Sequence, residues 1–517
     1  MTSDTAEIVT VDRSERARAQ SHAADLATAS REGDRRRWMR PLVGLRSDPA
    51  RRAAVRDTWR ALWVSRLLVW AAGIGAVAIF GVVTKRAAFD PPHVTSGFGW
   101  LGDLLVAPAA RWDAAWYLVI AHYGYLPGLA PPRSAFFPLY PLGIRGIAEI
   151  GVPPVLAGIL LSLVAFAFAL YGLHRLTALE APRLLGVGGR WPVGGAVDVD
   201  VDADADVGVD VNVDAKGPAA RAGGGAHTRA RGGEVARLAV LALALAPMAF
   251  YFSAVYSESL YLALSIGVFW CARQGRWAWV GVLGALAGAT RSAGLVLALP
   301  VAILYLYGPR EDRPPDFAPR RWRIAGIRYR VCGEALWLLA LPLGVLAYAV
   351  YLALAGGSPL EPFHAQEVWD RQFAGPYVAV WDAARAAFEG VWQLLSMQRR
   401  HIYFTLSGGD PLVSAEHNVV LFGFLLAAVP AIVGVLRRLP LAYGAYVLAA
   451  LALPLSYPVA AQPLMSLPRF LLVLFPLFMW LGAFLERRRP TRLVLLGFST
   501  LALAFFAGQF ATWHWVA

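Results

Sequence analysis

Long runs of apolar residues, separated by short polar segments, dominate the chain from residue 61 onward. A bilayer core of about 30 Å needs about 20 apolar residues per helix, and glycine or proline breaks allow shorter pieces. The pattern therefore predicts an all-α polytopic membrane protein with about eleven transmembrane helices. The long candidate spans are 61–83, 153–175, 334–355, 417–436, 440–459, 468–486 and 491–511, and shorter ones cover 237–254, 258–273, 277–290 and 293–308.

The composition agrees with this class and excludes several others. Hydrophobic residues make up 57% of the 517 positions and charged residues 16%, whereas soluble domains carry about 25% charged residues. The net charge of +13 does not indicate nucleic-acid binding, because the arginines form short clusters between apolar runs rather than a basic face. Cys271 and Cys332 are too far apart to indicate a disulfide framework, and no cysteine–histidine pattern has zinc spacing. We therefore expect no metal and no cofactor.

The arginine clusters predict the orientation, because positively charged loops stay in the cytoplasm. The clusters that this number of helices brings to one side are Arg273 with Arg276, residues 310–330, Arg437 with Arg438, and residues 487–492. That requires residues 84–152 to form one large external loop, with "FFPLYPLGIRGIAEI" (136–150) lying along the membrane interface. If this segment spans the membrane instead, every later loop changes side. The resulting expectation is that 84–152 and 357–416 lie outside, and that 177–236 and 309–333 lie inside.

Two polar segments divide the chain. Residues 1–60 are Arg-rich and lack the apolar core and cleavage site of a signal peptide, so we expect a disordered cytoplasmic tail. Residues 177–236 contain "VDVDVDADADVGVDVNVD", whose carboxylates would share one face of a strand and repel. We expect a disordered, low-complexity cytoplasmic insert. Residues 61–176 then hold the first helices and the catalytic external loop, and 237–517 the remaining helix bundle.

The stretch "RWDAAWYLVIAHYGYLPG" (111–128) is unusually polar and aromatic for its place in the chain. Asp113 precedes a predicted helix over 114–123 that ends at Gly124. One interpretation makes Asp113 its N-cap and Gly124 its C-cap. The other makes Asp113 a general base, kept ionised by the positive helix N-terminus. The nearby Trp112 is either a membrane-interface anchor or a platform for a sugar face.

Three later stretches add candidate chemistry on the predicted external side. In "FYFSAVYSESLYLAL" (250–264), Ser257 and Glu258 either stabilise the start of the following helix or belong to a site. Arg291 in "ATRSAGL" and Arg469 in "SLPRFLLVLFP" break the positive-inside pattern, which favours a functional role. A guanidinium at this depth is suited to a lipid phosphate. We expect replacement of either arginine to weaken donor use more than folding.

In order and spacing, "RWDAAWYLVIAHYGY", "SAFFPLYP", "FYFSAVYSESLYLALSIG", "ATRSAGL" and "LPRFLLVLFPLF" resemble the PIG-V family of mannosyltransferases, over roughly residues 60–510 apart from the insert. The resemblance implies a GT-C architecture and an enzyme that takes its sugar from a polyprenyl-phosphate carrier on the non-cytoplasmic face. It implies that Asp113 is catalytic. The expected substrate-binding residues are Arg111, Trp112, His122, Tyr125, Tyr256, Ser257, Glu258, Arg291 and Arg469.

The expected reaction is a single inverting displacement in the plasma membrane of a bacterium, with the site outside. Asp113 accepts the proton of a lipid or glycan acceptor, while Arg291, Arg469 or both neutralise the departing polyprenyl phosphate. The alternative is a lipid or glycolipid flippase, and a scaffold without activity is a third possibility. The predicted spans carry few charged residues, which favours a reaction at the lipid–water boundary over transport through the membrane midplane.

Overall fold

The computed structural model describes residues 48–82, 90, 93–186, 218–315, 326–399 and 410–516, with the side chains of 218–229 left out. The chain divides into two units, residues 1–56 and 57–517. In the first unit, residues 48–56 are described, and helix α2 (Pro49–Phe80) begins there. Asp48 accepts the amide hydrogen of Ala50 at 2.9 Å, and Pro49 occupies the first helical position, where proline is favourable. The expected disorder of 1–60 is therefore wrong for 49–60, and residues 1–47 lie outside the described part.

The described chain is all-α, as expected, and contains no β-strand beyond one isolated bridge between Arg371 and Val459. The first half runs α2, α3 (Gly99–Leu105), η2 (Ala107–Ala109), α4 (Ala114–Tyr123), α5 (Pro131–Ser134), α6 (Leu139–Ala148), α7 (Pro154–Leu185), α8 (Pro218–Ala244), η3 (Ala249–Phe252) and α9 (Glu258–Arg273). The second half runs α10 (Trp277–Thr290), η4 (Ser292–Leu297), α11 (Ala298–Tyr307), η6 (Gly333–Ala340), α12 (Leu343–Leu354), α13 (Glu361–His364), η7 (Ala365–Trp369), α14 (Pro376–Ser396), α15 (Pro411–Arg438), α16 (Leu441–Leu455), α17 (Leu467–Leu472), α18 (Phe475–Arg487) and α19 (Arg489–Ala511).

Fewer helices are long enough to cross a membrane than the apolar runs predicted. Four described helices qualify by length and composition, namely α2, α7, α15 and α19, and a fifth span results if η6 and α12, bent by 43°, count as one. These long apolar helices indicate a multi-pass membrane protein, but the expected eleven spans are not found. Helix α16 has 15 residues and extends only about 22 Å at 1.5 Å per residue. The run 468–486 is divided into α17 and α18, where Pro476 stands at the new helix start.

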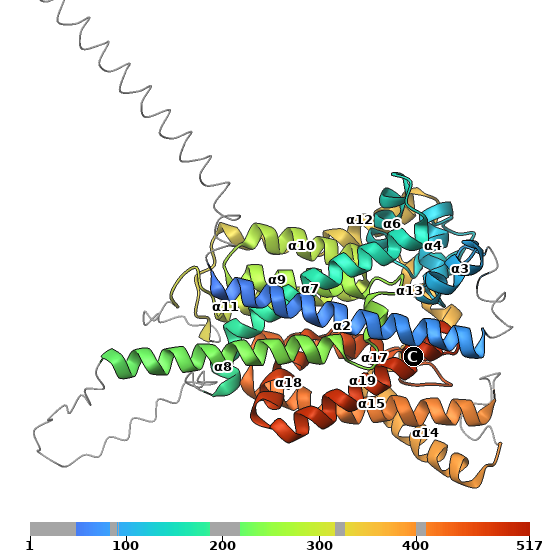
Figure 1. Ribbon diagram of the computed structural model, residues 1–517. Helices are drawn as coiled ribbons and strands as arrows, with labels where there is room; N and C mark the ends of the chain where they lie inside the picture. Colours follow the sequence, from blue (N-terminus) through green and yellow to red (C-terminus); the bar gives the residue numbers. More distant parts are fainter. Residues whose placement is uncertain are drawn as a thin grey trace, which may run out of the picture. The chain divides into compact units, whose positions relative to one another are not determined.

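Small residues allow the helices of the second unit to approach closely. Helix α7 lies against both α8 and α9, α10 packs on α12, and α8 packs on α18 (Figure 1). A side chain added at Gly344 of α12 would overlap the backbone of Ala285 in α10, and one added at Gly482 of α18 would reach the carbonyl of Val235 in α8. Backbone contact of this kind is how helices associate when the surrounding solvent is as apolar as their side chains.

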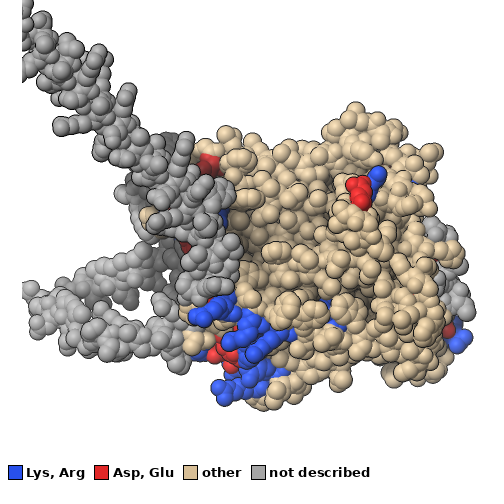
Figure 2. Space-filling model, turned by 45° about the horizontal axis from the view of Figure 1, so that its top comes forward, with Lys and Arg blue, Asp and Glu red and all other residues tan. Residues whose placement is uncertain are grey.

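The arginine clusters meet at one end of the helices, as expected. Arg273 at the end of α9 bonds Glu180 of α7 at 2.6 Å, and Arg487 at the end of α18 donates to the carbonyl of Leu184 at 2.9 Å. Lys and Arg side chains gather in one patch on the face shown in Figure 2. Arg438 also reaches this end, because its guanidinium lies next to Gly186, which follows α7. Because α9 starts at Glu258 and ends at Arg273, its full length separates this end from the residues discussed below.

The structure describes the segment 136–150 and part of the insert 177–236. Helix α6 has ten residues, about 15 Å, which is too short to span a bilayer and favours the interfacial position predicted for 136–150. The insert is shorter than expected, because α7 continues to Leu185 and α8 begins at Pro218. The aspartate repeat itself lies outside the described residues.

Arg66 is a buried cation in the middle of α2 that the sequence did not single out. Its guanidinium donates to the carbonyls of Ala249 at 2.7 Å and Ala244 at 3.3 Å, and to the hydroxyl of Ser253 at 3.0 Å. These groups belong to the break between α8 and η3, where carbonyls lose their intrahelical donors. Arg66 therefore serves as a structural cap on that break, and it is an exception to the expected scarcity of charge within the spans.

The predicted orientation can be tested at two exposed positions. In a variant lacking Cys271 and Cys332, we expect Glu149→Cys to react with a membrane-impermeant maleimide in intact cells and Arg488→Cys to react only after permeabilisation. Glu149 follows α6 in the predicted external loop, and Arg488 belongs to the arginine-rich end. The reverse labelling pattern would show that the orientation is inverted.

Candidate functional site

Helix α4 brings Asp113 to the site. The helix runs from Ala114 to Tyr123 and is followed by Gly124, whose positive φ of 75° is readily adopted only by glycine. Asp113 occupies the N-cap position, but its side chain makes no capping bond. Its Oδ2 instead pairs with the guanidinium of Arg469 at 2.7 Å. The capping interpretation is therefore wrong for this side chain, because the charge-assisted bond to Arg469 takes the place of a bond to the helix amides.

Glu258 is the centre of the charged group. It is the first residue of α9 and is 0% exposed. Its Oε1 accepts bonds from Arg469 Nε at 3.0 Å and Arg469 NH2 at 2.8 Å, and lies 2.7 Å from Arg291 NH1. Asp113, Glu258, Arg291 and Arg469 thus form one carboxylate–arginine cluster. Its two negative and two positive charges cancel, which is the condition under which charges tolerate burial.

The Tyr-Ser-Glu-Ser turn (256–259) contacts the cluster. Tyr256 donates through its hydroxyl to the carbonyl of Arg111 at 3.0 Å and accepts the amide hydrogen of Asp113 at 3.1 Å. The guanidinium carbon of Arg469 lies 5.0 Å from the centre of the Tyr256 ring, within cation–π range. Ser257 makes no capping bond and pairs with the hydroxyl of Tyr117 at 2.8 Å. The turn therefore fixes Asp113 and Arg469 relative to each other.

The C-terminal end of α19 and the residues that follow it contact the "RWD" turn. Arg111 Nε donates to the carbonyl of Ala511 at 2.9 Å, and the Trp112 ring contacts Trp513 and Trp515 edge to face. Trp112 has a φ of 55°, a conformation that costs about 1–3 kcal/mol in a bulky residue and persists only where the surroundings impose it. Arg111 and Trp112 thus position Asp113 without lining the pocket described next.

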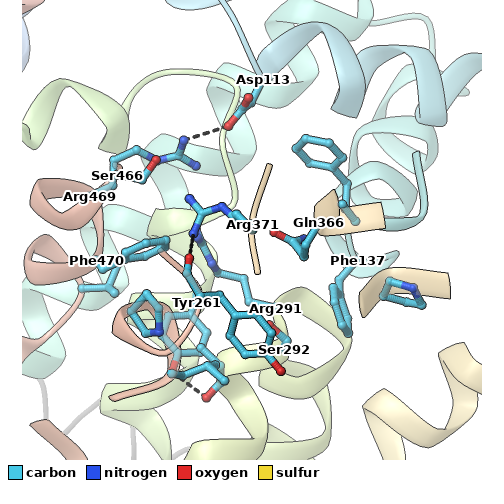
Figure 3. Close-up of a pocket in the computed structure, with 18 of the residues that line it drawn as sticks. Asp113, Phe137, Tyr261, Arg291, Ser292, Gln366, Arg371, Ser466, Arg469 and Phe470 are labelled. Atoms are coloured by element: carbon cyan, nitrogen blue, oxygen red, sulfur yellow. Dashed lines mark hydrogen bonds and ion pairs between the residues drawn. The ribbon is translucent and has the colours of Figure 1, made fainter. Parts of the chain in front are cut away.

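A pocket of about 240 Å³ opens beside the cluster and is lined by Asp113, Arg291 and Arg469 (Figure 3). Aromatic rings and aliphatic side chains contribute much of its wall. The rings include Tyr117, Phe136, Trp369, Tyr457 and Trp515, and the other apolar residues include Ala450, Leu453, Phe470, Val473 and Leu474. The pocket therefore combines charged groups with a largely apolar lining.

The structure brings some of the expected site residues together and separates others. Asp113, Arg291 and Arg469 line the pocket, and Glu258 lies directly behind them. Tyr256 and Ser257 lie in the supporting layer. His122 is exposed against Tyr123, and Tyr125 is buried with its hydroxyl on the carbonyl of Phe136 at 2.7 Å. Neither His122 nor Tyr125 is among the residues that line the pocket.

The sequence did not identify Arg371, which follows η7 and lies in the pocket between Arg469 and Gln366 (Figure 3). Burial and the positive charge of Arg469 lower the pKa of Arg371 to about 10, with Asp113 acting in the opposite direction. Arg291 and Arg469 were singled out because they break the positive-inside pattern, and Arg371, on the predicted outer side, breaks it as well. Arg385 and Arg399, nearby in the sequence, also break it, so the sequence alone could not select one of the three.

Among the described residues, no group of three histidine, cysteine, aspartate or glutamate side chains could hold a metal ion; the metal-free mechanism stays a prediction. Comparisons with protein families, curated proteins and solved structures found no match to this chain.

Proposed function

We propose that this protein is an integral membrane glycosyltransferase that moves a mannosyl residue from a polyprenyl-phosphate donor to a lipid-linked or glycan acceptor on the non-cytoplasmic face. The observation that carries the proposal is the position of Asp113, whose carboxylate lines a pocket together with arginines and many apolar side chains. A lipid-linked phosphosugar likewise combines an anionic group with an apolar chain. The mannosyl group itself is inferred from the resemblance to the PIG-V family.

The proposed step is a single inverting displacement. The acceptor hydroxyl oxygen forms a bond to the anomeric carbon as the bond from that carbon to the phosphate oxygen breaks, and the phosphate leaves with the electron pair. Asp113 takes the proton of the attacking hydroxyl. Its pairing with Arg469 at 2.7 Å holds the carboxylate at the pocket wall. The hydroxyl proton becomes acidic as the new bond forms, so its transfer to a nearby carboxylate accompanies the displacement.

The apolar residues of the pocket support a lipid-linked rather than a soluble donor. Ala450 and Leu453 come from α16, and Val473 follows α17, so two helical segments contribute apolar side chains to the wall. Apolar chain buried there contributes roughly 0.8 kcal/mol per methylene group. The aromatic wall, which includes Trp369 and Trp515, offers flat surfaces for the sugar ring.

The test is an assay of the purified full chain in lipid nanodiscs with radiolabelled polyprenyl-phosphate mannose and a membrane lipid extract as acceptor. We expect release of the polyprenyl phosphate together with labelled product. In sealed vesicles, movement of the intact donor across the bilayer without cleavage would instead support the flippase alternative. Absence of both cleavage and movement would favour a scaffold.

A further inference from the structure

The charges around the pocket do not balance. In the carboxylate–arginine cluster, the charges of Asp113 and Glu258 are matched by Arg291 and Arg469. Arg371 is the remaining charged residue among the described side chains that line the pocket, and no carboxylate of the described part lies within ion-pair distance of it. The pocket therefore carries one positive charge in excess.

The guanidinium of Arg371 is fixed in place but poorly satisfied. Its backbone forms the isolated bridge with Val459, which holds the loop after η7 against the segment before α17. Its side chain reaches the carbonyls of Tyr457 and Met465 only at 3.4 and 3.5 Å. A guanidinium has five N–H donors in a planar fork. These two long contacts therefore leave most of its N–H groups able to bind a ligand in the pocket.

An anion in the pocket would neutralise the excess positive charge and accept hydrogen bonds from the unused N–H groups of Arg371. A partly buried cation costs free energy as long as it has no such partner. Phosphate oxygens fit the fork of an arginine in bidentate geometry. Arg291 and Arg469 are less suited to this task, because Glu258 and Asp113 already accept their bonds.

We propose that Arg371 is the residue that binds the phosphate group of the substrate, an inference that rests on the proposed function for the identity of the phosphate as part of a lipid donor. Arg291 and Arg469 then serve chiefly to hold Glu258 and Asp113. The apolar side chains that line the same pocket receive the chain attached to the phosphate.

The experiment measures binding of dodecyl phosphate, dodecanol and inorganic phosphate to the full chain in nanodiscs. Arg371→Gln is expected to weaken dodecyl phosphate binding about 10- to 100-fold, the loss typical of hydrogen bonds to a charged group. Arg371→Lys should restore part of it, because a point charge cannot reproduce the fork. Dodecanol binding should not change. The matched control is Arg385→Gln, which alters an exposed arginine of α14 that does not line the pocket.

The outcomes separate this inference from the proposed function. Arg371-dependent binding of dodecyl phosphate alone supports a lipid headgroup, and equal dependence for inorganic phosphate supports a free phosphate as the ligand of the same residue. Equal affinity of Arg371→Gln and the unmodified protein for dodecyl phosphate would overturn the assignment, even if glycosyl transfer is observed. Arg371-dependent binding without any glycosyl transfer would leave this residue's role standing and remove the proposed reaction.

Discussion

Replacing Asp113 with asparagine is expected to lower turnover about 10²- to 10⁴-fold, the range typical of losing a general base, while the chain still inserts and folds. An amide cannot take the proton of the acceptor hydroxyl. Its oxygen can still accept a bond from Arg469, which retains its two bonds to Glu258. Helix α4 should also keep its start, because the Asp113 side chain makes no capping bond.

The matched control is Asp103→Asn, which alters another aspartate of the predicted first external loop. Asp103 accepts the amide hydrogens of Gly97 at 3.0 Å and Phe98 at 3.1 Å, so it stabilises a turn. An asparagine oxygen can accept the same bonds, so this variant should keep most of its activity. Rates are measured with saturating donor on protein of verified thermal stability. Near-normal turnover by Asp113→Asn would exclude Asp113 as the base.

Replacing Glu258 with glutamine is expected to destabilise the protein by about 3–5 kcal/mol, the cost of breaking a buried ion pair. Glu258 is 0% exposed and matches two guanidiniums. Its removal leaves Arg291 and Arg469 with Asp113 as the remaining carboxylate of the cluster. The loss should appear as a lower midpoint of thermal unfolding and a smaller monodisperse fraction in detergent.

Glu234 offers a matched comparison, because it also pairs with two arginines, Arg237 at 2.7 Å and Arg492 at 3.0 Å. Its side chain is 33% exposed, and ion pairs of this kind contribute at most about 1 kcal/mol. We therefore expect Glu234→Gln to change the unfolding midpoint little. Equal losses in the two variants would contradict a special role for burial at Glu258.

The cluster also changes the expected effect of replacing Arg291 or Arg469. The sequence led us to expect that replacing Arg291 or Arg469 would weaken donor use more than folding. Since both arginines bond Glu258, their removal leaves a buried carboxylate partly unmatched and affects stability as well. Donor kinetics for these two positions are therefore informative only on protein whose stability has been measured in parallel.

The sequence predicted the positions of the helices better than their lengths. Apolar runs indicate where a helix forms, but they do not reveal where it bends or stops. Helices η6 and α12 lie within one expected span and meet at a 43° bend. The run 468–486 breaks before Phe475 for a local reason, since the proline that follows cannot donate the backbone bond that would continue the preceding helix.

The residues of the carboxylate–arginine cluster were predictable from the sequence, but their pairings were not. Asp113, Glu258, Arg291 and Arg469 were each singled out by position in the chain, and the structure brings them together. Their bonds join residues 356 apart for Asp113 with Arg469 and 211 apart for Glu258 with Arg469. Hydrophobic periodicity carries no information about which helices become neighbours, so neither these ion pairs nor the unmatched Arg371 could be read from it.

The buried guanidinium of Arg66 has a consequence for how the protein is made. Its carbonyl acceptors, Ala244 and Ala249, are synthesised 178 and 183 residues later. At roughly 5–20 residues per second, Arg66 is made about 10–35 s before those acceptors. During that interval an arginine in the middle of an apolar helix costs about 2.5–3.5 kcal/mol in lipid. The first helix therefore gains the partners of its buried cation only when the ribosome has delivered the break between α8 and η3.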